Sequence, residues 1–194
     1  MRIITGTAGG IPIAVPRTVL RPTADRVREA VFSILGPRVE GAVVLDLFAG
    51  SGSYGLECLS RGATSALFVD QERQSAQVIA QTLAKARLTG GKVTTANVES
   101  WLRRADGLRF DIIFADPPYA KQRGDKDWNT LLLTSAAMPR LLAPGGLLLL
   151  ESYSRNPLAL PPDSPWHLLN ERKYGDCMVL FLECPSPLAE PAAG

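Results

Sequence analysis

The chain has 194 residues, a formal net charge of +2, 46% hydrophobic residues and 21% charged residues. This length suits one domain that buries about 70% of its unfolded surface, and the composition is typical of a globular protein. No apolar run approaches the roughly 20 residues that span a bilayer, and the first residues lack the long apolar region of a secretory signal. Three irregularly spaced cysteines and a single histidine argue against a disulfide framework and a metal site. We therefore expect a cytoplasmic protein with no membrane segment and no metal.

The first 40 residues predict a small β-rich arm followed by a helix. Residues 2–16 alternate weakly around a glycine-rich turn, and Pro12 favours an edge strand. Thr23 is a candidate N-cap for a helix that ends at Gly36 and Pro37. The apolar stripe of that helix has helical spacing and consists of Val27, Ala30, Val31, Ile34 and Leu35. Arginine is abundant in this part of the chain, which suits contacts to phosphate, although an arginine-rich solvated surface explains it equally well.

From residue 42 onward, strand patterns alternate with helix patterns, which predicts a parallel sheet covered on both faces. The expected strands are residues 42–47, 65–70, 92–96, 110–115 and 146–151. The expected helices are residues 53–60, 72–87, 98–104 and 127–142. Residues 166–172 and 177–183 are expected to pair as an antiparallel hairpin at the end of the sheet. The Pro- and Ala-rich residues 185–194 are expected to be a disordered tail.

A glycine-rich turn after the first central strand predicts a cofactor site. Such a turn, at the carboxyl end of a parallel strand and before a helix, is where nucleotide-like ligands bind. The spacing of Gly50, Gly52 and Gly55, with Asp70 about 20 residues on, fits a dinucleotide such as NAD. Asp46 favours S-adenosylmethionine instead, because a carboxylate repels a pyrophosphate and attracts an ammonium group. The turn alone leaves both ligands open; its candidate contact residues are Asp46, Phe48, Ala49, Gly50, Ser51 and Gly52.

The fourth expected strand delivers Asp116, Pro117, Pro118 and Tyr119 to the same edge of the sheet. The two prolines fix the backbone and remove two N–H donors, so that carbonyl oxygens are free to face a ligand. A carboxylate and a proline carbonyl can accept both hydrogens of an exocyclic amino group, while Tyr119 can stack on the ring that bears it. These four residues are therefore the candidate catalytic residues for methylating an amino group on a heteroaromatic ring, with Asp116 also next to the cofactor.

Two further polar residues follow expected strands. Asp70 ends the second strand and is expected to accept both ribose hydroxyls of the cofactor, with a helix N-cap as the alternative. Asn97 follows the third strand and is expected either to bond the adenine edge or to cap the next helix, two roles that are compatible.

Together the motifs closely resemble the RsmD family of bacterial 16S ribosomal RNA (guanine-N2) methyltransferases. The resemblance runs from about Arg2 to Glu183, and its most specific part is the arginine-rich segment 21–29 combined with Asp116–Tyr119. It implies a Rossmann-like class I α/β methyltransferase fold: a seven-stranded, mostly parallel sheet ending in an antiparallel hairpin, with a small N-terminal β arm and helix. The implied organisation is a single domain over residues 1–184, with the arm and helix in 1–40 and the core in 41–184.

The resemblance also implies the reaction and its partners. The cofactor would be S-adenosylmethionine, and the substrate would be one guanine of 16S rRNA within the small ribosomal subunit, methylated by a monomeric enzyme. The residues implied to flank the base pocket or grip RNA are Arg21, Thr23, Asp25, Arg26 and Arg28. A DNA adenine-N6 methyltransferase is the main alternative, because it shares the Asp-Pro-Pro-Tyr motif. An NAD-dependent oxidoreductase is less well supported, because the single His167 lies in the expected hairpin, far from the glycine turn.

Overall fold

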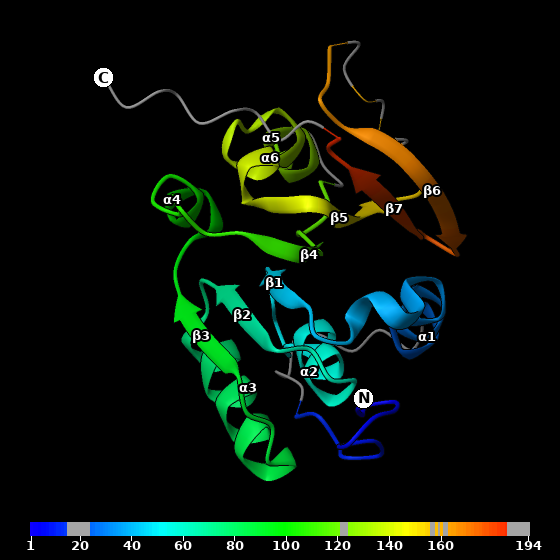
Figure 1. The fold of residues 1–194 in the computed structure, drawn as a ribbon. Helices are drawn as coiled ribbons and strands as arrows, with labels where there is room; N and C mark the ends of the chain where they lie inside the picture. The colour runs from blue at the N-terminus through cyan, green and yellow to red at the C-terminus, as the bar shows by residue number, and fades with distance from the viewer. Residues whose placement is uncertain (15–23, 121–123, 156–157, 159, 161–162, 186–194) are drawn as a thin grey trace.

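The computed structural model describes residues 1–14, 24–120, 124–155, 158, 160 and 163–185 (Figure 1). The elements are α1 (Ala24–Leu35), η1 (Gly36–Val39), β1 (Val43–Leu47), α2 (Ser53–Ser60), β2 (Ser65–Asp70), α3 (Arg73–Ala86), β3 (Gly91–Thr95), α4 (Val98–Leu102), β4 (Phe110–Ala115), α5 (Trp128–Thr134), α6 (Ala137–Leu141), β5 (Leu142–Tyr153), β6 (His167–Tyr174) and β7 (Cys177–Glu183). Across the described parts of the chain, no helix combines the length and apolar character needed to cross a membrane.

The strands form one seven-stranded sheet in the order β3-β2-β1-β4-β5-β7-β6. The neighbours from β3 to β5 are parallel, whereas β7 is antiparallel to both β5 and β6. The strand order reverses between β1 and β4, so the loops that follow these two strands diverge and leave a crevice at the carboxyl edge. The predicted fold class, including the closing hairpin, is confirmed.

Alternate residues of the central strands face two separate layers of the core. One layer packs the N-terminal arm, α1, α2 and α3 against strand residues such as Val44, Phe68 and Phe114. The other packs α4, α5 and α6 against the intervening residues such as Leu45, Ile113 and Leu148. Figure 1 shows these two helical layers on opposite faces of the sheet. A sheet buried on both faces holds its strand ends rigidly, which is what a binding site at that edge requires.

The expected helix over 127–142 is wrong. The structure has two short helices, α5 and α6, separated by an extended residue, Ser135, with φ −70° and ψ 121°. Pro139 lies in α6 and has no N–H to donate to the carbonyl of residue 135, so one continuous helix would lose a hydrogen bond there. The last central strand also starts earlier than expected, at Leu142, and its pairing with β4 shifts register between Phe110 and Ile112.

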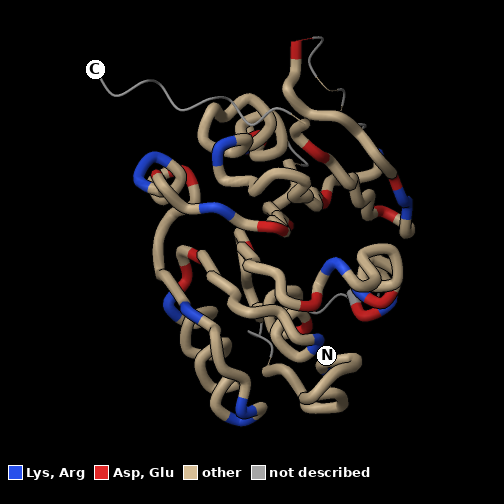
Figure 2. Tube along the Cα trace, viewed as in Figure 1, with Lys and Arg blue, Asp and Glu red and all other residues tan. Residues whose placement is uncertain are grey.

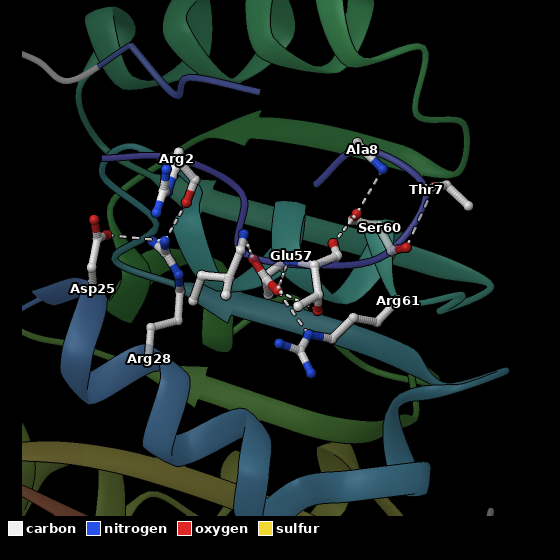
Figure 3. Close-up of polar contacts among 10 residues, drawn as sticks. Arg2, Thr7, Ala8, Asp25, Arg28, Glu57, Ser60 and Arg61 are labelled. Atoms are coloured by element: carbon white, nitrogen blue, oxygen red, sulfur yellow. Dashed lines mark hydrogen bonds and ion pairs between the residues drawn. The ribbon is translucent and has the colours of Figure 1, made fainter. Parts of the chain in front are cut away.

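The described part of the N-terminal arm forms no regular strand; backbone hydrogen bonds between residues 1–3 and 10–13 close it on itself, and α2 holds it against the sheet. It contains an isolated bridge between Arg2 and Pro12. The backbone N–H groups of Ile4 and Thr5 donate to the buried carboxylate of Glu57, at 2.6 and 3.1 Å (Figure 3). Ser60 Oγ accepts from Ala8 N and donates to the Thr5 carbonyl, and Arg61 Nε donates to Glu57 at 2.7 Å. We call Glu57, Ser60 and Arg61 the α2 clamp. It fixes the arm so that Met1 reaches the crevice at the strand ends.

Several predictions concern residues outside the described part of the chain. They are the N-cap at Thr23, the RNA contacts of Arg21 and Thr23, and the disorder of the tail beyond residue 185.

Candidate active site

A pocket of about 610 Å³ lies at the carboxyl edge of the sheet, where the strand order reverses. Its lining brings together nearly all the cofactor residues expected from sequence: Asp46, Phe48, Ala49, Gly50, Ser51, Asp70, Asn97 and Asp116. Gly52 does not line the pocket, because it packs against the side chains of Ile79 and Phe68 in the core. A Cβ on Gly52 would lie 2.7 Å from Ile79 Cγ1, and its φ of +73° favours glycine.

Asp70 ties the glycine turn to the end of β2. Its Oδ2 accepts from Gly50 N at 2.7 Å, and its Oδ1 accepts from Glu72 N at 2.8 Å. Each carboxylate oxygen can accept a second hydrogen bond, so both remain available to hydroxyl donors from a ligand. The backbone bonds orient the carboxylate before any ligand arrives.

Asp46 is a buried carboxylate that faces other acids. Its side chain is 3% exposed, and its Oδ2 accepts from Gly55 N at 2.9 Å. Burial raises the pKa of Asp46 to about 8; the Gly55 hydrogen bond opposes that shift, and the charges of Asp70 and Glu151 reinforce it. A carboxylate in this position is stabilised by a cationic ligand and destabilised by an anionic one.

Asn97 lies at the third strand end and caps the following helix. Its Oδ1 accepts from Ser100 N at 3.2 Å, as expected for an N-cap. Its Nδ2 donates to Gln71 Oε1 at 3.4 Å, and both residues line the pocket. This arrangement confirms the capping role and leaves the bond to an adenine edge as a proposal.

The Asp-Pro-Pro-Tyr segment divides between two cavities. Asp116 and Pro117 line the main pocket, Pro118 lines both cavities, and Tyr119 lines only the small adjoining one. The Tyr119 ring stacks on Tyr153 at 5.7 Å between centroids. Burial, and then the charge of Asp116, raises the pKa of Tyr119 above its ordinary value. The structure thus places the Tyr119 ring beside the main pocket and against another aromatic ring. Trp128 lines both cavities, so it is an aromatic surface at their junction that sequence reasoning missed.

Glu151 is a further pocket carboxylate that the sequence reasoning missed. Ala115 pairs with Leu150, so Asp116 and Glu151 follow on adjacent strands at the same level of the sheet. Glu151 is 9% exposed; its Oε1 accepts from Tyr54 Oη at 2.5 Å and its Oε2 from Cys177 Sγ at 3.1 Å. Burial, and then Glu151, raises the pKa of both the Tyr54 hydroxyl and the Cys177 thiol. A signal was present, because Glu151 directly follows the apolar run 147–150, just as Asp70 directly follows the apolar run 66–69.

The charged residues of helix α1 differ widely in their exposure to solvent. Arg26 is exposed, and Asp25 is partly exposed. Arg28 is 1% exposed and lines the main pocket. The expectation that these residues flank the pocket therefore fits Arg28, whereas an Arg28 contact to RNA at the surface does not fit its burial. Within the described residues, no group of three His, Cys, Asp or Glu side chains could hold a metal ion.

The strand order and this acidic pocket define a Rossmann-like methyltransferase. The family model described as Conserved hypothetical protein 95 matches residues 1–183. The Ribosomal RNA small subunit methyltransferase D of Escherichia coli (strain K12) is 37% identical over 176 residues, which are 90% of this chain and 85% of that protein. The chain therefore belongs to the RsmD family, as its sequence motifs predicted.

Solved structures agree with this assignment. The hypothetical protein TTHA0928 of Thermus thermophilus is 31% identical, with a TM-score of 0.77 over 94% of this chain and 99% of that one. SMU.776, which was solved in complex with SAH, has a TM-score of 0.68 over 84% of this chain and 50% of that one. At 17% identity, the likeness to SMU.776 shows a common fold.

Proposed function

We propose that this protein transfers a methyl group from S-adenosylmethionine to the exocyclic N2 amino group of a guanine in 16S rRNA, on an assembled or assembling small ribosomal subunit. The observation that carries the proposal is that one pocket holds both Asp116 and the cofactor-type residues Asp46, Gly50 and Asp70. The name of the Escherichia coli relative, Ribosomal RNA small subunit methyltransferase D, supports the substrate class.

The pocket residues fit S-adenosylmethionine better than a dinucleotide. Asp70 has two oriented oxygens that would accept from the ribose hydroxyls, and Asn97, at the next strand end in the same pocket, would bond the adenine edge. Asp46 would face the ammonium group of the methionine moiety, which favours the ionised form of its carboxyl group, whereas a pyrophosphate at that place would meet acidic side chains. When bound, S-adenosylmethionine supplies an electrophilic methyl group on a sulfonium centre.

The residues of this chain would act mainly by positioning the acceptor. An amino group on a guanine ring is a poor nucleophile, because its lone pair is delocalised into the ring. We infer that the Asp116 carboxylate and the Pro117 carbonyl accept the two amino hydrogens, which favours pyramidal nitrogen and aims its lone pair. The Asp116 carboxylate also stabilises the positive charge that develops on nitrogen, which then loses one proton to Asp116 or to solvent. Pro117 and Pro118 offer no N–H that would compete for these acceptors.

The Glu151 carboxylate favours guanine over adenine as the substrate. Guanine presents two neighbouring donors, N1–H and the amino group, whereas adenine presents an amino group beside an acceptor nitrogen. Asp116 and Glu151 both line the pocket and offer carboxylate oxygens. Two such groups can accept from both guanine donors, and one of them would face the adenine acceptor without a hydrogen. The DNA adenine-N6 alternative is therefore the weaker candidate.

RNA binding would depend on exposed basic residues near the pocket mouth. Lys and Arg are spread over several elements of the described chain (Figure 2). We propose that the exposed Arg26 and the partly exposed Asp25 contact RNA. Arg21 and Thr23, which lie outside the described residues, are proposed to share this role. The proposed enzyme is a monomer with one domain over residues 1–184, and a ribosomal substrate implies a cytoplasmic location.

The test is methyl transfer to small ribosomal subunits that lack the modification. Radiolabelled S-adenosylmethionine, purified particles and the full chain are incubated, and the RNA is digested to nucleosides. Labelled N2-methylguanosine is expected. Labelled N6-methyladenosine, or no label in particles that a family member modifies under the same conditions, would overturn the proposal. Protein-free 16S rRNA run in parallel shows whether the particle is required.

A further inference from the structure

Arg28 is a buried arginine whose hydrogen-bonding capacity is only partly used. Its Nη2 donates to the carbonyl of Arg2 and, at 3.0 Å, to Asp25 Oδ1 (Figure 3). Its Nε and Nη1 are buried and have no hydrogen-bond partner. Asp25, its ion-pair partner, is 46% exposed, so water weakens that pair. The guanidinium is therefore held in place by two contacts and still has free donors.

A buried guanidinium with free donors requires a partner, because arginine does not lose its proton in proteins. Leaving buried donors unpaired is unfavourable, and the cost is larger for a charged group. Arg28 lines the main pocket, so a ligand in that pocket can reach it. The missing partner is thus expected to be an anionic group of the ligand.

The charge pattern of the pocket specifies which anion. Among the lining residues that the structure describes, Arg28 carries the one basic side chain; the acidic ones are Asp46, Asp70, Glu72, Asp116 and Glu151. A ligand rich in phosphate would meet mostly like charge there. A ligand with two cationic centres and one carboxylate is complementary to this pocket, because its cations would face the acidic side chains and its carboxylate would face the single arginine. The methionine moiety of S-adenosylmethionine has this pattern: a sulfonium, an ammonium and a carboxylate.

We propose that Arg28 binds the carboxylate of the methionine moiety of S-adenosylmethionine. The inference rests on the proposed function, since it takes that cofactor as the ligand of the pocket. It reassigns Arg28 from the RNA contacts to the cofactor site and leaves the exposed Arg26, two residues away, to the RNA. Asp25 and the Arg2 carbonyl then act as positioning groups, and the α2 clamp holds the arm that supplies the carbonyl.

The test combines a protein change with a ligand change. Isothermal calorimetry measures the binding of SAH and of its decarboxylated analogue, which keeps the amino group, to wild-type protein, Arg28→Met and Arg28→Lys. For SAH, Arg28→Met is expected to lower affinity about 10- to 100-fold, the size of a lost charge-assisted hydrogen bond. For the decarboxylated analogue, the same substitution is expected to change affinity less than about twofold. Arg28→Lys, which keeps the charge, should lose less affinity for SAH.

Arg26→Met is the matched control on the same helix, and it should bind both ligands as wild type does. Equal losses of both ligands in Arg28→Met would overturn the inference and make Arg28 a structural residue. If Arg28→Met does not fold, as judged by circular dichroism, the same comparison is decided by Arg28→Lys. A wild-type protein that binds neither SAH nor S-adenosylmethionine would overturn the proposed function as well, so the two failures are distinguishable.

Discussion

The α2 clamp and the main pocket both contain buried ionisable side chains, but the hydrogen-bonding capacity of these side chains is satisfied to different degrees. Glu57 in the clamp is fully buried and accepts from two backbone N–H groups, from Thr5 Oγ1 and from Arg61. In the pocket, Asp46 has one backbone donor and acidic neighbours, and Arg28 keeps two unpartnered nitrogens. The buried charge of the clamp has its hydrogen-bond partners without a ligand, whereas the buried groups of the pocket still lack some of theirs.

This difference separates stability from function. A buried charge that is fully hydrogen-bonded fixes the structure around it, and removing its partner is strongly destabilising. A buried charge that lacks partners lowers stability until a ligand supplies them. Substitutions in the clamp should therefore act on folding, and substitutions in the pocket should act on binding and catalysis.

The largest effect is expected from Asp116→Ala. Removing the carboxylate that accepts from the amino group should slow methyl transfer about 10³-fold, as for other groups that stabilise developing charge. Single-turnover rates with unmodified small subunits measure this loss. The affinity for SAH should stay within a few fold of wild type, and the stability should change by less than about 1 kcal/mol, because Asp116 is exposed. An unchanged rate would remove Asp116 from the catalytic residues.

Glu57→Ala should destabilise the protein by about 3 kcal/mol, because it removes a fully buried acceptor and leaves the N–H groups of Ile4 and Thr5 and the Arg61 guanidinium without it. Urea denaturation measures this change. Arg61→Met is the matched comparison and should cost about 1 kcal/mol, since Arg61 is 24% exposed and Glu57 would keep its backbone donors. A loss below about 1 kcal/mol for Glu57→Ala would break the distinction between clamp and pocket.

Asp46→Asn should have opposite effects on stability and on binding. The native pKa of Asp46, about 8, lies above that of the unfolded chain, so the native state holds a proton that the unfolded state releases. Wild-type stability should therefore fall as the pH rises from about 4 to about 8, and Asp46→Asn should remove that fall. At pH 8 the ligand-free variant should be more stable by roughly 1–3 kcal/mol.

The same variant should bind SAH more weakly, because an amide does not attract the ammonium group. Urea denaturation between pH 5 and 9 and calorimetry with SAH measure the two effects. A variant with the same pH dependence of stability as wild type would show that Asp46 is not the titrating group.

The smallest effect is expected from Glu151→Gln on the neighbouring thiol. Glu151 is, after burial, the main reason that the pKa of Cys177 is raised, so its loss should increase the thiolate fraction. Alkylation of Cys177 by iodoacetamide at pH 8.5 should become several-fold faster, as followed by peptide mass spectrometry. Cys58 is the internal reference, because the acidic groups that raise its pKa are Asp46 and Glu57. An unchanged ratio of the two rates would mean that Glu151 does not control this part of the pocket.

The sequence predicted the core strands and the strand-end residues correctly because short apolar runs and glycine turns are local signals. Asp46, Asp70 and Asp116 could be placed at one edge because parallel strands all deliver their carboxyl ends to the same side. Pro139 indicated that one continuous helix over residues 127–142 would lose a hydrogen bond. The apolar pattern on both sides of Pro139 nevertheless favoured a single helix. The position of Tyr119 beside the pocket could not be predicted from the neighbouring sequence, because it depends on packing against Tyr153, which is distant in the chain.

By itself, then, the sequence determined the family, the sheet and the residues that meet at its edge, because periodicity and short motifs survive without knowledge of distant contacts. Only the tertiary structure decided which charges are balanced. Glu57 meets residues 4 and 5, Glu151 meets Tyr54 and Cys177, and Arg28 meets Arg2, all through contacts between segments far apart in the chain. Burial and hydrogen bonding set the energy of a charged group, and both depend on folding.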